Sequence, residues 1–387
     1  MNGKKGGVEE LILPIMTISQ IMGTTYYKKT LENNKKKIFL YRIIILSFII
    51  MVLVHEIPTM IFWTRNTEGI HAILAFMETR LRWGVVIINL IVNSGRNGKF
   101  NEVVEELTNT ELNVYDDKKK IIWFQIFILS STLTLLICYM CLGVDVLWIN
   151  PYYHWYTSSV YIITEFYTGF ANVQFVVVLF VIKKHLTALK DDIRNSDFKL
   201  MNGSKKKDVM VFFVCSKFKR DDIGEIVKFR QIHMNLMNVC YKTNDCFCIQ
   251  VFIFLMTSLV EMTYSFRSAV VFYLNPDGGS VNSWKTKYWY EVALIFFWGG
   301  YYMWQILIII VSCSAVIFEA FDISNAVNDL LNKVEDKESK KQIFSLQIMN
   351  HQIVFYGGKF IILNYPLINS IIGTVMTYLV IISTSNF

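Results

Sequence analysis

The sequence predicts an all-α fold: a polytopic membrane protein with seven transmembrane helices, in an inverted topology that leaves the amino terminus in the cytoplasm. Three observations predict it. Of the 387 residues, 53% are hydrophobic and only 18% are charged, against about 25% charged residues in an average soluble domain. The apolar residues gather in long blocks, as they do in membrane proteins. The lysines and arginines concentrate in alternate segments between those blocks.

Seven stretches are long enough to cross the membrane, for which a helix needs about 20 residues. The second is the least apolar, because it carries Glu78, Arg80 and Arg82. The sixth has 33 residues; at roughly 50 Å long, it is expected to leave the bilayer at one end. The predicted spans are Ile38–Trp63, Ile70–Val92, Ile121–Ile149, Trp155–Ile182, Phe247–Leu274, Tyr288–Ala320 and Phe360–Asn386.

The orientation follows from the distribution of lysine and arginine. The four segments on one face of the membrane hold thirty of these residues, with the last segment counted over Phe321–Gln342, and the three loops on the other face hold three, Arg65, Lys285 and Lys287. Basic residues favour the cytoplasmic side. We therefore expect a multi-pass membrane protein with a cytoplasmic amino terminus. The same distribution explains the net charge of +7 without a nucleic-acid partner.

The cytoplasmic segments are expected to contain helices. After the sixth span, Asp322 and Ser324 are candidate helix caps, and the apolar pattern beyond them predicts two helices that continue spans six and seven below the membrane. Leu11–Met22 is expected to be a short interfacial helix. The predicted domains are 1–37, a cytoplasmic segment with that helix; 38–320, a six-span bundle with cytoplasmic loops 93–120 and 183–245; 321–359, anchor helices; and 360–387, the seventh span.

Nothing in the sequence predicts an enzyme, a metal site or a cofactor. Cys138 and Cys141 form a C-x-x-C pattern, but it lies inside a predicted span, where packing is the better interpretation. His55-Glu56 begins like a zinc-protease motif and lacks the second histidine. The chain is therefore not expected to be an enzyme.

The seventh span carries a stripe of hydroxyl groups. Ser370, Thr374, Thr377, Ile381 and Thr384 are spaced by four, three, four and three residues, so that they share one face of a helix. Such a stripe has two interpretations. Small polar residues pack well against a neighbouring helix. Alternatively, the stripe lines a pore with an apolar ring at Ile381, and a pore requires several copies of the chain around it.

The end of the chain resembles the carboxyl-terminal block of insect gustatory receptors. That block has Thr-Tyr, five mostly apolar residues and Gln-Phe, and Thr377-Tyr378 with the apolar run after it is similar. Thr384 and Ser385 stand where the family has Gln-Phe, and Asn386-Phe387 is a version shifted by two residues. Further similar residues are Phe360, Leu363-Asn364-Tyr365, Ile371-Ile372, Gly373, Leu13-Pro14 and Gln20-Ile21-Met22-Gly23.

The resemblance implies a function. Members of the insect chemoreceptor superfamily are seven-helix, ligand-gated cation channels built from four subunits, in which the seventh spans line the pore. It therefore implies a non-selective cation channel opened by a small-molecule tastant, as a homo- or heterotetramer in membrane lipid. Ile381 and Thr384 inherit the apolar constriction and the polar ring, with Thr384 in place of the glutamine. Two alternatives stay open: a metabotropic seven-helix receptor, and an odorant-receptor-like subunit that needs a partner.

The resemblance also places a ligand pocket among spans one to six, in the outer half of the membrane. Polar and aromatic side chains that share a helix face there are the candidates, although packing in the core is an alternative for each of them. Pocket candidates are Glu78, Arg82, Tyr161, Glu165, Tyr264, Arg267, Trp298, Tyr301, Tyr302 and Gln305.

Overall fold

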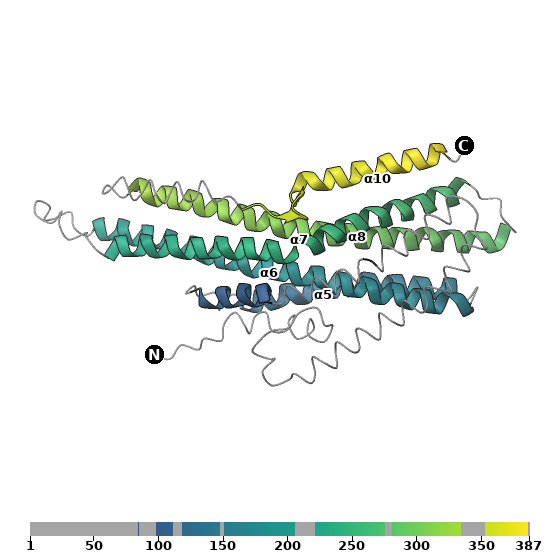
Figure 1. Ribbon diagram of the computed structural model, residues 1–387, viewed down its shortest axis with the longest axis horizontal. Helices are drawn as coiled ribbons and strands as arrows, with labels where there is room; N and C mark the ends of the chain where they lie inside the picture. The colour runs from purple at the N-terminus through teal and green to yellow at the C-terminus, as the bar shows by residue number, and fades with distance from the viewer. Residues whose placement is uncertain are drawn as a thin grey trace, which may run out of the picture.

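Long helices that run side by side build the chain, and one shorter helix lies along the outside of half their length (Figure 1). The computed structural model describes residues 84, 98–110, 118–147, 151–205, 221–274, 281–333 and 353–385. Its elements are a helical segment 98–109, α5 (Lys118–Leu147), α6 (Pro151–Lys205), α7 (Asp221–Leu274), α8 (Val281–Lys333), strands β1 (Tyr356–Gly357) and β2 (Ile361–Ile362), and α10 (Tyr365–Ser385).

Three helices are much longer than a membrane span. The helices α6, α7 and α8 have 55, 54 and 53 residues, which makes each about 80 Å long. They contain predicted spans four to six and extend well past them on the side that the sequence assigns to the cytoplasm. The helix α8 runs on through Asp322 and Ser324, so the prediction that these residues cap a new helix was wrong. Asp322 instead accepts a hydrogen bond from Lys190 of α6 at 3.4 Å.

Within the described residues, three helices are long and apolar enough to cross a membrane. They are Tyr167–Asn195, Val227–Thr263 and Phe296–Asp329. Predicted span three corresponds to α5, which covers nearly the same residues. Spans one and two, the interfacial helix Leu11–Met22, and the pocket candidates Glu78 and Arg82 lie outside the described residues.

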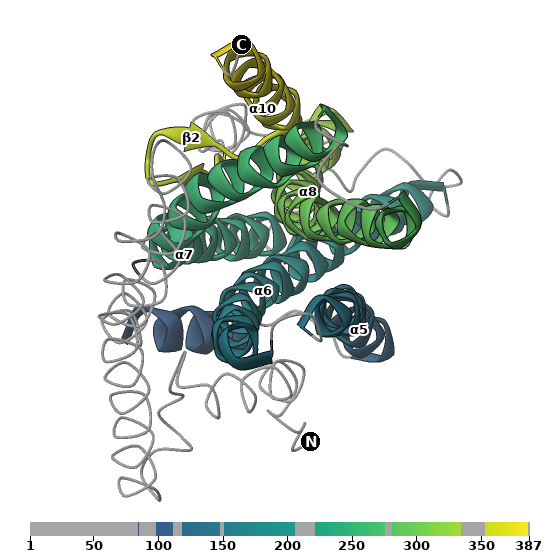
Figure 2. The same ribbon diagram turned by 90° about the vertical axis from the view of Figure 1, so that its right-hand side faces the viewer.

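The helix α6 occupies the middle of the bundle. It packs against α5, α7 and α8, and the view along the bundle shows these three helices on different sides of it (Figure 2). Phe170, Val173, Val177 and Ile182 are at most 2% exposed. Because these residues lie within predicted span four, where lipid tails are as apolar as the side chains, their burial stabilises the bundle through close van der Waals packing rather than through removal from water. A charged pair also joins α6 to α8, between Lys190 and Glu319.

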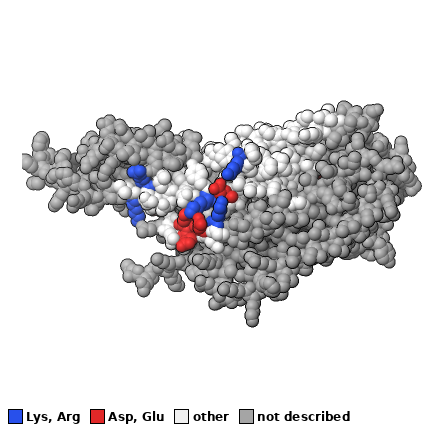
Figure 3. Space-filling view, viewed as in Figure 1, with Lys and Arg blue, Asp and Glu red and all other residues white. Residues whose placement is uncertain are grey.

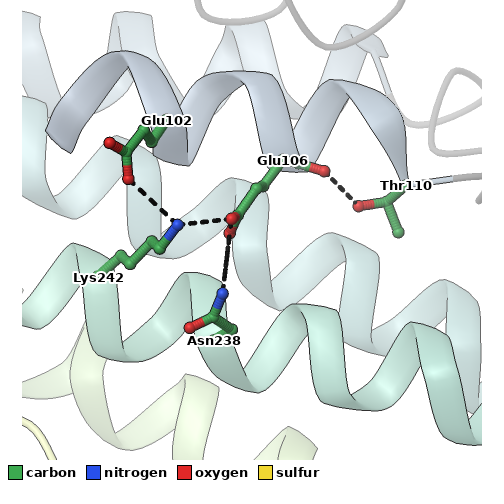
Figure 4. A network of polar contacts seen from close by, with 5 residues as sticks. All are labelled: Glu102, Glu106, Thr110, Asn238 and Lys242. Atoms are coloured by element: carbon green, nitrogen blue, oxygen red, sulfur yellow. Dashed lines mark hydrogen bonds and ion pairs between the residues drawn. The ribbon is translucent and has the colours of Figure 1, made fainter. Parts of the chain in front are cut away.

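The helical segment 98–109 docks on α7. Its apolar residues Phe100, Val103, Val104 and Leu107 recur at helical spacing and are at most 2% exposed, which fixes the face that it buries. On the rim, Lys242 of α7 contacts Glu106 at 2.6 Å and Glu102 at 3.2 Å, and Asn238 donates to Glu106 (Figure 4). Partly exposed ion pairs contribute about 0–1 kcal/mol, so the apolar face dominates the docking.

A β-hairpin precedes α10 and holds the amino-terminal end of that helix. Strands β1 and β2 pair antiparallel, with Tyr356 opposite Ile362. The prediction that the seventh span begins at Phe360 was wrong, because the helix begins at Tyr365, and residues 353–359 are likewise not helical. The turn carries Gly358 at φ 61° and Lys359 at φ 66°, a conformation that suits glycine and is incompatible with a continuous helix.

The hairpin is bound to the middle of α7 by backbone groups. The N–H of Gly358 donates to the carbonyl of Cys248 at 2.8 Å, and the N–H of Tyr356 donates to the side-chain oxygen of Asn244 at 2.8 Å. Phe355 and Leu363 are fully buried beneath it. The start of α10 is therefore fixed to α7, whereas the rest of α10 runs along the bundle toward the end where the carboxyl terminus lies (Figure 1).

Candidate functional site

The polar and aromatic face of α8 lies inside the bundle. Trp298, Tyr301, Tyr302 and Gln305 are spaced by three, one and three residues and are at most 6% exposed. The ring of Trp298 meets that of Tyr302 edge-on at 5.2 Å and lies nearly parallel to that of Tyr301 at 6.0 Å. Aromatic pairs at these distances favour such geometries. We call these four residues, with Glu165, Glu261 and Thr132, the bundle cluster.

Glu165 of α6 connects the two tyrosines. Tyr302 donates its hydroxyl to the Glu165 carboxyl oxygen at 2.8 Å, and Tyr301 donates to the Glu165 backbone carbonyl at 3.1 Å. This close approach requires Gly169, since a Cβ there would collide with the Tyr301 hydroxyl. The structure thus brings together five pocket candidates, the four aromatic and polar residues of α8 and Glu165.

Two further residues of the cluster were missed by sequence reasoning. Glu261 of α7 is 1% exposed and accepts a hydrogen bond from the indole N–H of Trp298 at 3.4 Å. Thr132 of α5 accepts one from the side chain of Gln305 at 3.4 Å. An acid within an apolar span is costly and usually functional, so Glu261 could have been found on that ground. Thr132 carried no such signal, because hydroxyls are common in membrane helices.

The bundle cluster forms one layer across four helices. Glu165 is fourteen residues from the start of α6, Glu261 is thirteen from the end of α7, Trp298 is seventeen from the start of α8, and Thr132 is fifteen from the end of α5. The end of α5, the start of α6, the end of α7 and the start of α8 mark one end of the bundle. The separations place the layer about 20–25 Å from this end. Tyr161 in α6 and Tyr264 and Arg267 in α7 belong to the same half, but their side chains are not among those described.

Replacing Tyr302 with phenylalanine is expected to lower the stability of the protein by about 1 kcal/mol, because a buried carboxyl loses its donor. Thermal unfolding of the purified protein in detergent measures the effect. The matched variant Tyr301→Phe removes a hydroxyl that donates to a backbone carbonyl at a longer distance, and it is expected to cost less. A larger loss with Tyr301→Phe would contradict this ranking.

The helix α10 buries one face and exposes the rest. Ile371 and Val375 are at most 4% exposed against the bundle, and α10 packs against α7 and α8. The opposite side carries exposed apolar residues, among them Met376 and Val380, at 57% and 60%. In the space-filling view, most of the charged side chains that are coloured lie together near the middle of the face (Figure 3), and α10 itself contains no charged residue.

The predicted hydroxyl stripe lies on the exposed part of α10. Four residues of the stripe are exposed: Ser370, Thr374, Thr377 and Ile381. They lie on a different face of α10 from the buried residues that pack on α7 and α8. The side chain of Thr384 is beyond the described set. Tyr378 of the Thr-Tyr pair is 53% exposed. Within one copy of the chain, the stripe is therefore not used for packing against the described helices.

The three described hydroxyls of the stripe donate their hydrogen bonds within α10 itself. Ser370, Thr374 and Thr377 donate to the backbone carbonyls of Pro366, Ser370 and Gly373, at 3.3, 2.7 and 2.8 Å. Each side-chain donor is thus used within the helix, as is common for serine and threonine in helices. The oxygen of each hydroxyl can still accept a hydrogen bond from its surroundings. A row of uncharged acceptors suits water and partly hydrated cations.

The sequence and the fold were compared with known proteins. A family model described as 7tm Chemosensory receptor matches residues 12–383. The chain is similar to the solved structure of the insect olfactory receptor OR5 from Machilis hrabei in complex with eugenol, with a TM-score of 0.74 and 12% identity over 98% of each chain. It is also similar to OR5 without that ligand, with a TM-score of 0.73 and 12% identity over 97% of this chain and 98% of that one. No curated protein matches the sequence.

Proposed function

Because this chain belongs to the 7tm chemosensory receptor family, and so is a membrane-spanning receptor, we propose that it is a gustatory receptor. It acts as a non-selective cation channel of the plasma membrane that a small-molecule tastant opens. Its amino terminus is proposed to lie in the cytoplasm, which the distribution of basic residues favours. The Thr377-Tyr378 block at the end of α10 favours a gustatory over an olfactory role.

The exposed hydroxyl stripe of α10 carries the proposal. Ser370, Thr374 and Thr377 present acceptor oxygens on a face that the described helices of the same chain leave uncovered. One such helix cannot enclose a pore, so the proposal requires an assembly, and four copies are proposed. Their α10 helices then surround a path for cations, with Ile381 as the apolar ring that closes it.

The bundle cluster is the proposed ligand site. It combines two carboxyl groups, three large aromatic rings and an amide in one buried layer, which is the composition of sites for small organic molecules. The receptor OR5 has been solved with eugenol, and a small organic ligand is proposed here also. The ligand shifts the population toward the open state because it binds that state more tightly.

The helices α7 and α8 connect the bundle cluster to α10, which supports a coupling between ligand binding and channel opening. The helix α7 supplies Glu261 to the bundle cluster and also holds the hairpin at Asn244 and Cys248. The helix α8 supplies Trp298 and packs against α10. A change at the cluster that shifts α7 or α8 therefore acts directly on the helix that is proposed to line the pore.

Two other functions remain to be separated by experiment. A metabotropic receptor would signal through G proteins, and an odorant-receptor-like subunit would need a second chain. Whole-cell recording from cells that express this chain alone is the test, with a tastant panel and with G-protein signalling blocked. A ligand-evoked current that survives the block supports the proposal. A current that disappears under the block contradicts it, and a current that needs a co-expressed partner favours the odorant-like alternative.

A further inference from the structure

A basic and aromatic surface lies where α5 and α6 meet, outside both proposed sites. The rings of Phe124 on α5 and Phe180 on α6 stack, with their centroids 3.8 Å apart and their planes 16° from parallel. The two helices are antiparallel neighbours in the chain. This stacked pair therefore fixes the register between them and serves as a landmark for the residues on either side.

Two lysines lie one helical turn from the stacked pair, toward the same end of the bundle. Lys120 precedes Phe124 by four residues, and Lys184 follows Phe180 by four; residues four apart share a helix face. The ammonium group of Lys184 is 5.8 Å from the centroid of the Phe180 ring, within cation–π range. The antiparallel register therefore brings both lysines to one level beside the aromatic pair.

The local charge is positive. Lys119 and Lys183 adjoin the two lysines, and no acidic residue occurs in 118–144 or in 166–190. Asp116 and Asp117 precede this basic run in the sequence, and Asp191 and Asp192 follow Lys190. Over 116–144 and 166–192, six lysines stand against these four aspartates, which leaves an excess of two positive charges. Such an excess on two neighbouring helices attracts an anion.

Above the lysines, the surface of α5 is apolar and exposed. Trp123, Ile126 and Phe127 are 69%, 50% and 59% exposed. Tryptophan favours the boundary between headgroups and hydrocarbon, and lysine side chains extend from that boundary toward water while their stems stay on apolar surface. The order along the helices is thus a basic level, then an aromatic level, then the apolar span, which matches the layers of a phospholipid.

We propose that this surface, formed by Lys120, Lys184, Trp123, Phe124 and Phe180, binds an anionic phospholipid of the cytoplasmic leaflet. The phosphate groups of the lipid contact the two lysines, and its acyl chains cover the exposed aromatic residues of α5. Clusters of basic residues at the cytoplasmic ends of transmembrane helices recognise phosphoinositide and serine headgroups. The bound lipid ties the start of α5 to α6.

The test is a titration of the purified full-length receptor in detergent with short-chain phosphatidylinositol bisphosphate, with phosphatidylcholine and free inositol trisphosphate as comparisons. The wild-type receptor is expected to bind the anionic lipid in preference to both. Removal of two charges by Lys120→Gln with Lys184→Gln is expected to weaken binding roughly thirtyfold. The arginine variants Lys120→Arg with Lys184→Arg are expected to retain it.

A matched control removes two exposed lysines elsewhere, Lys99→Gln with Lys359→Gln, and is expected to leave lipid affinity unchanged. Trp123→Ala is expected to weaken binding of the lipid while leaving any binding of the free headgroup unaffected. Equal affinity for phosphatidylcholine, equal loss in the control, or equal affinity for inositol trisphosphate would overturn the proposal. Since the readout is lipid binding, the outcome is independent of channel activity.

Discussion

Replacing Ile381 with serine is expected to raise the basal current about tenfold, because an apolar ring keeps a narrow pore free of water when the channel is closed. Ile381 lies on the hydroxyl stripe of α10 and is 53% exposed within one chain. Burial of an isoleucine is worth roughly 1.5–3 kcal/mol, and a loss of about 1.4 kcal/mol from the closed state changes the closed-to-open ratio tenfold. Current without ligand, normalised to surface expression, measures the effect.

The neighbouring residue provides the control for Ile381→Ser. Val380 is also exposed and lies at nearly the same depth, but it belongs to the apolar side of α10. Val380→Ser is expected to leave the basal current close to that of the wild type. An Ile381→Ser receptor that reaches the surface and stays silent would favour packing of the stripe against another helix. An equal rise in both variants would mean that the wrong face has been assigned to the pore.

Replacing Gly358 with alanine is expected to destabilise the receptor by about 2–3 kcal/mol and to abolish most of the ligand-evoked current. Gly358 adopts φ 61°, and an L residue in that region costs about 1–2 kcal/mol. An added Cβ would also lie 2.7–3.0 Å from side-chain atoms of Phe252, so the hairpin must move away from α7. Thermal unfolding in detergent and ligand dose–response curves measure the two effects.

Gly300→Ala is the matched control, because an added Cβ at Gly300 in α8 meets nothing within 4 Å. Alanine has a higher helix propensity than glycine, so this variant is expected to be as stable as the wild type or slightly more stable. Asn244→Ala removes one side-chain bond to the hairpin and is expected to show a weaker form of the Gly358→Ala defect, about 1 kcal/mol. Wild-type gating in Gly358→Ala would contradict the role of the hairpin in coupling.

The sequence was informative where apolar pattern decides the structure. Long apolar blocks predicted the helices that are now α5 to α8, and the four-three spacing predicted the stripe from Ser370 to Thr377 on one face of α10. It failed at the ends of elements. Asp322 was predicted to cap a new helix, but α8 continues through it without a break, and its side chain accepts a hydrogen bond from Lys190. Phe360 reads as part of a span, but the turn at Gly358 and Lys359 forms a hairpin.

The candidate ligand site shows the same division. The residues on the α8 face were predicted to lie together because they are near in sequence. Their partners come from other helices: Glu165 from α6, Glu261 from α7 and Thr132 from α5. Contacts between distant segments depend on the register of packed helices, which a single sequence does not specify. For the same reason, neither the need for Gly169 beneath Tyr301 nor the anchoring of the hairpin on α7 could be predicted.

The most direct test of a ligand-gated channel is reconstitution of the purified chain, with no other protein, into a planar lipid bilayer that contains anionic phospholipid. With an activating tastant from the cell-based panel, we predict discrete single-channel cation currents whose open probability rises with ligand concentration, and Ile381→Ser channels that open without it. A folded, ligand-binding receptor that conducts no current under these conditions would contradict the account.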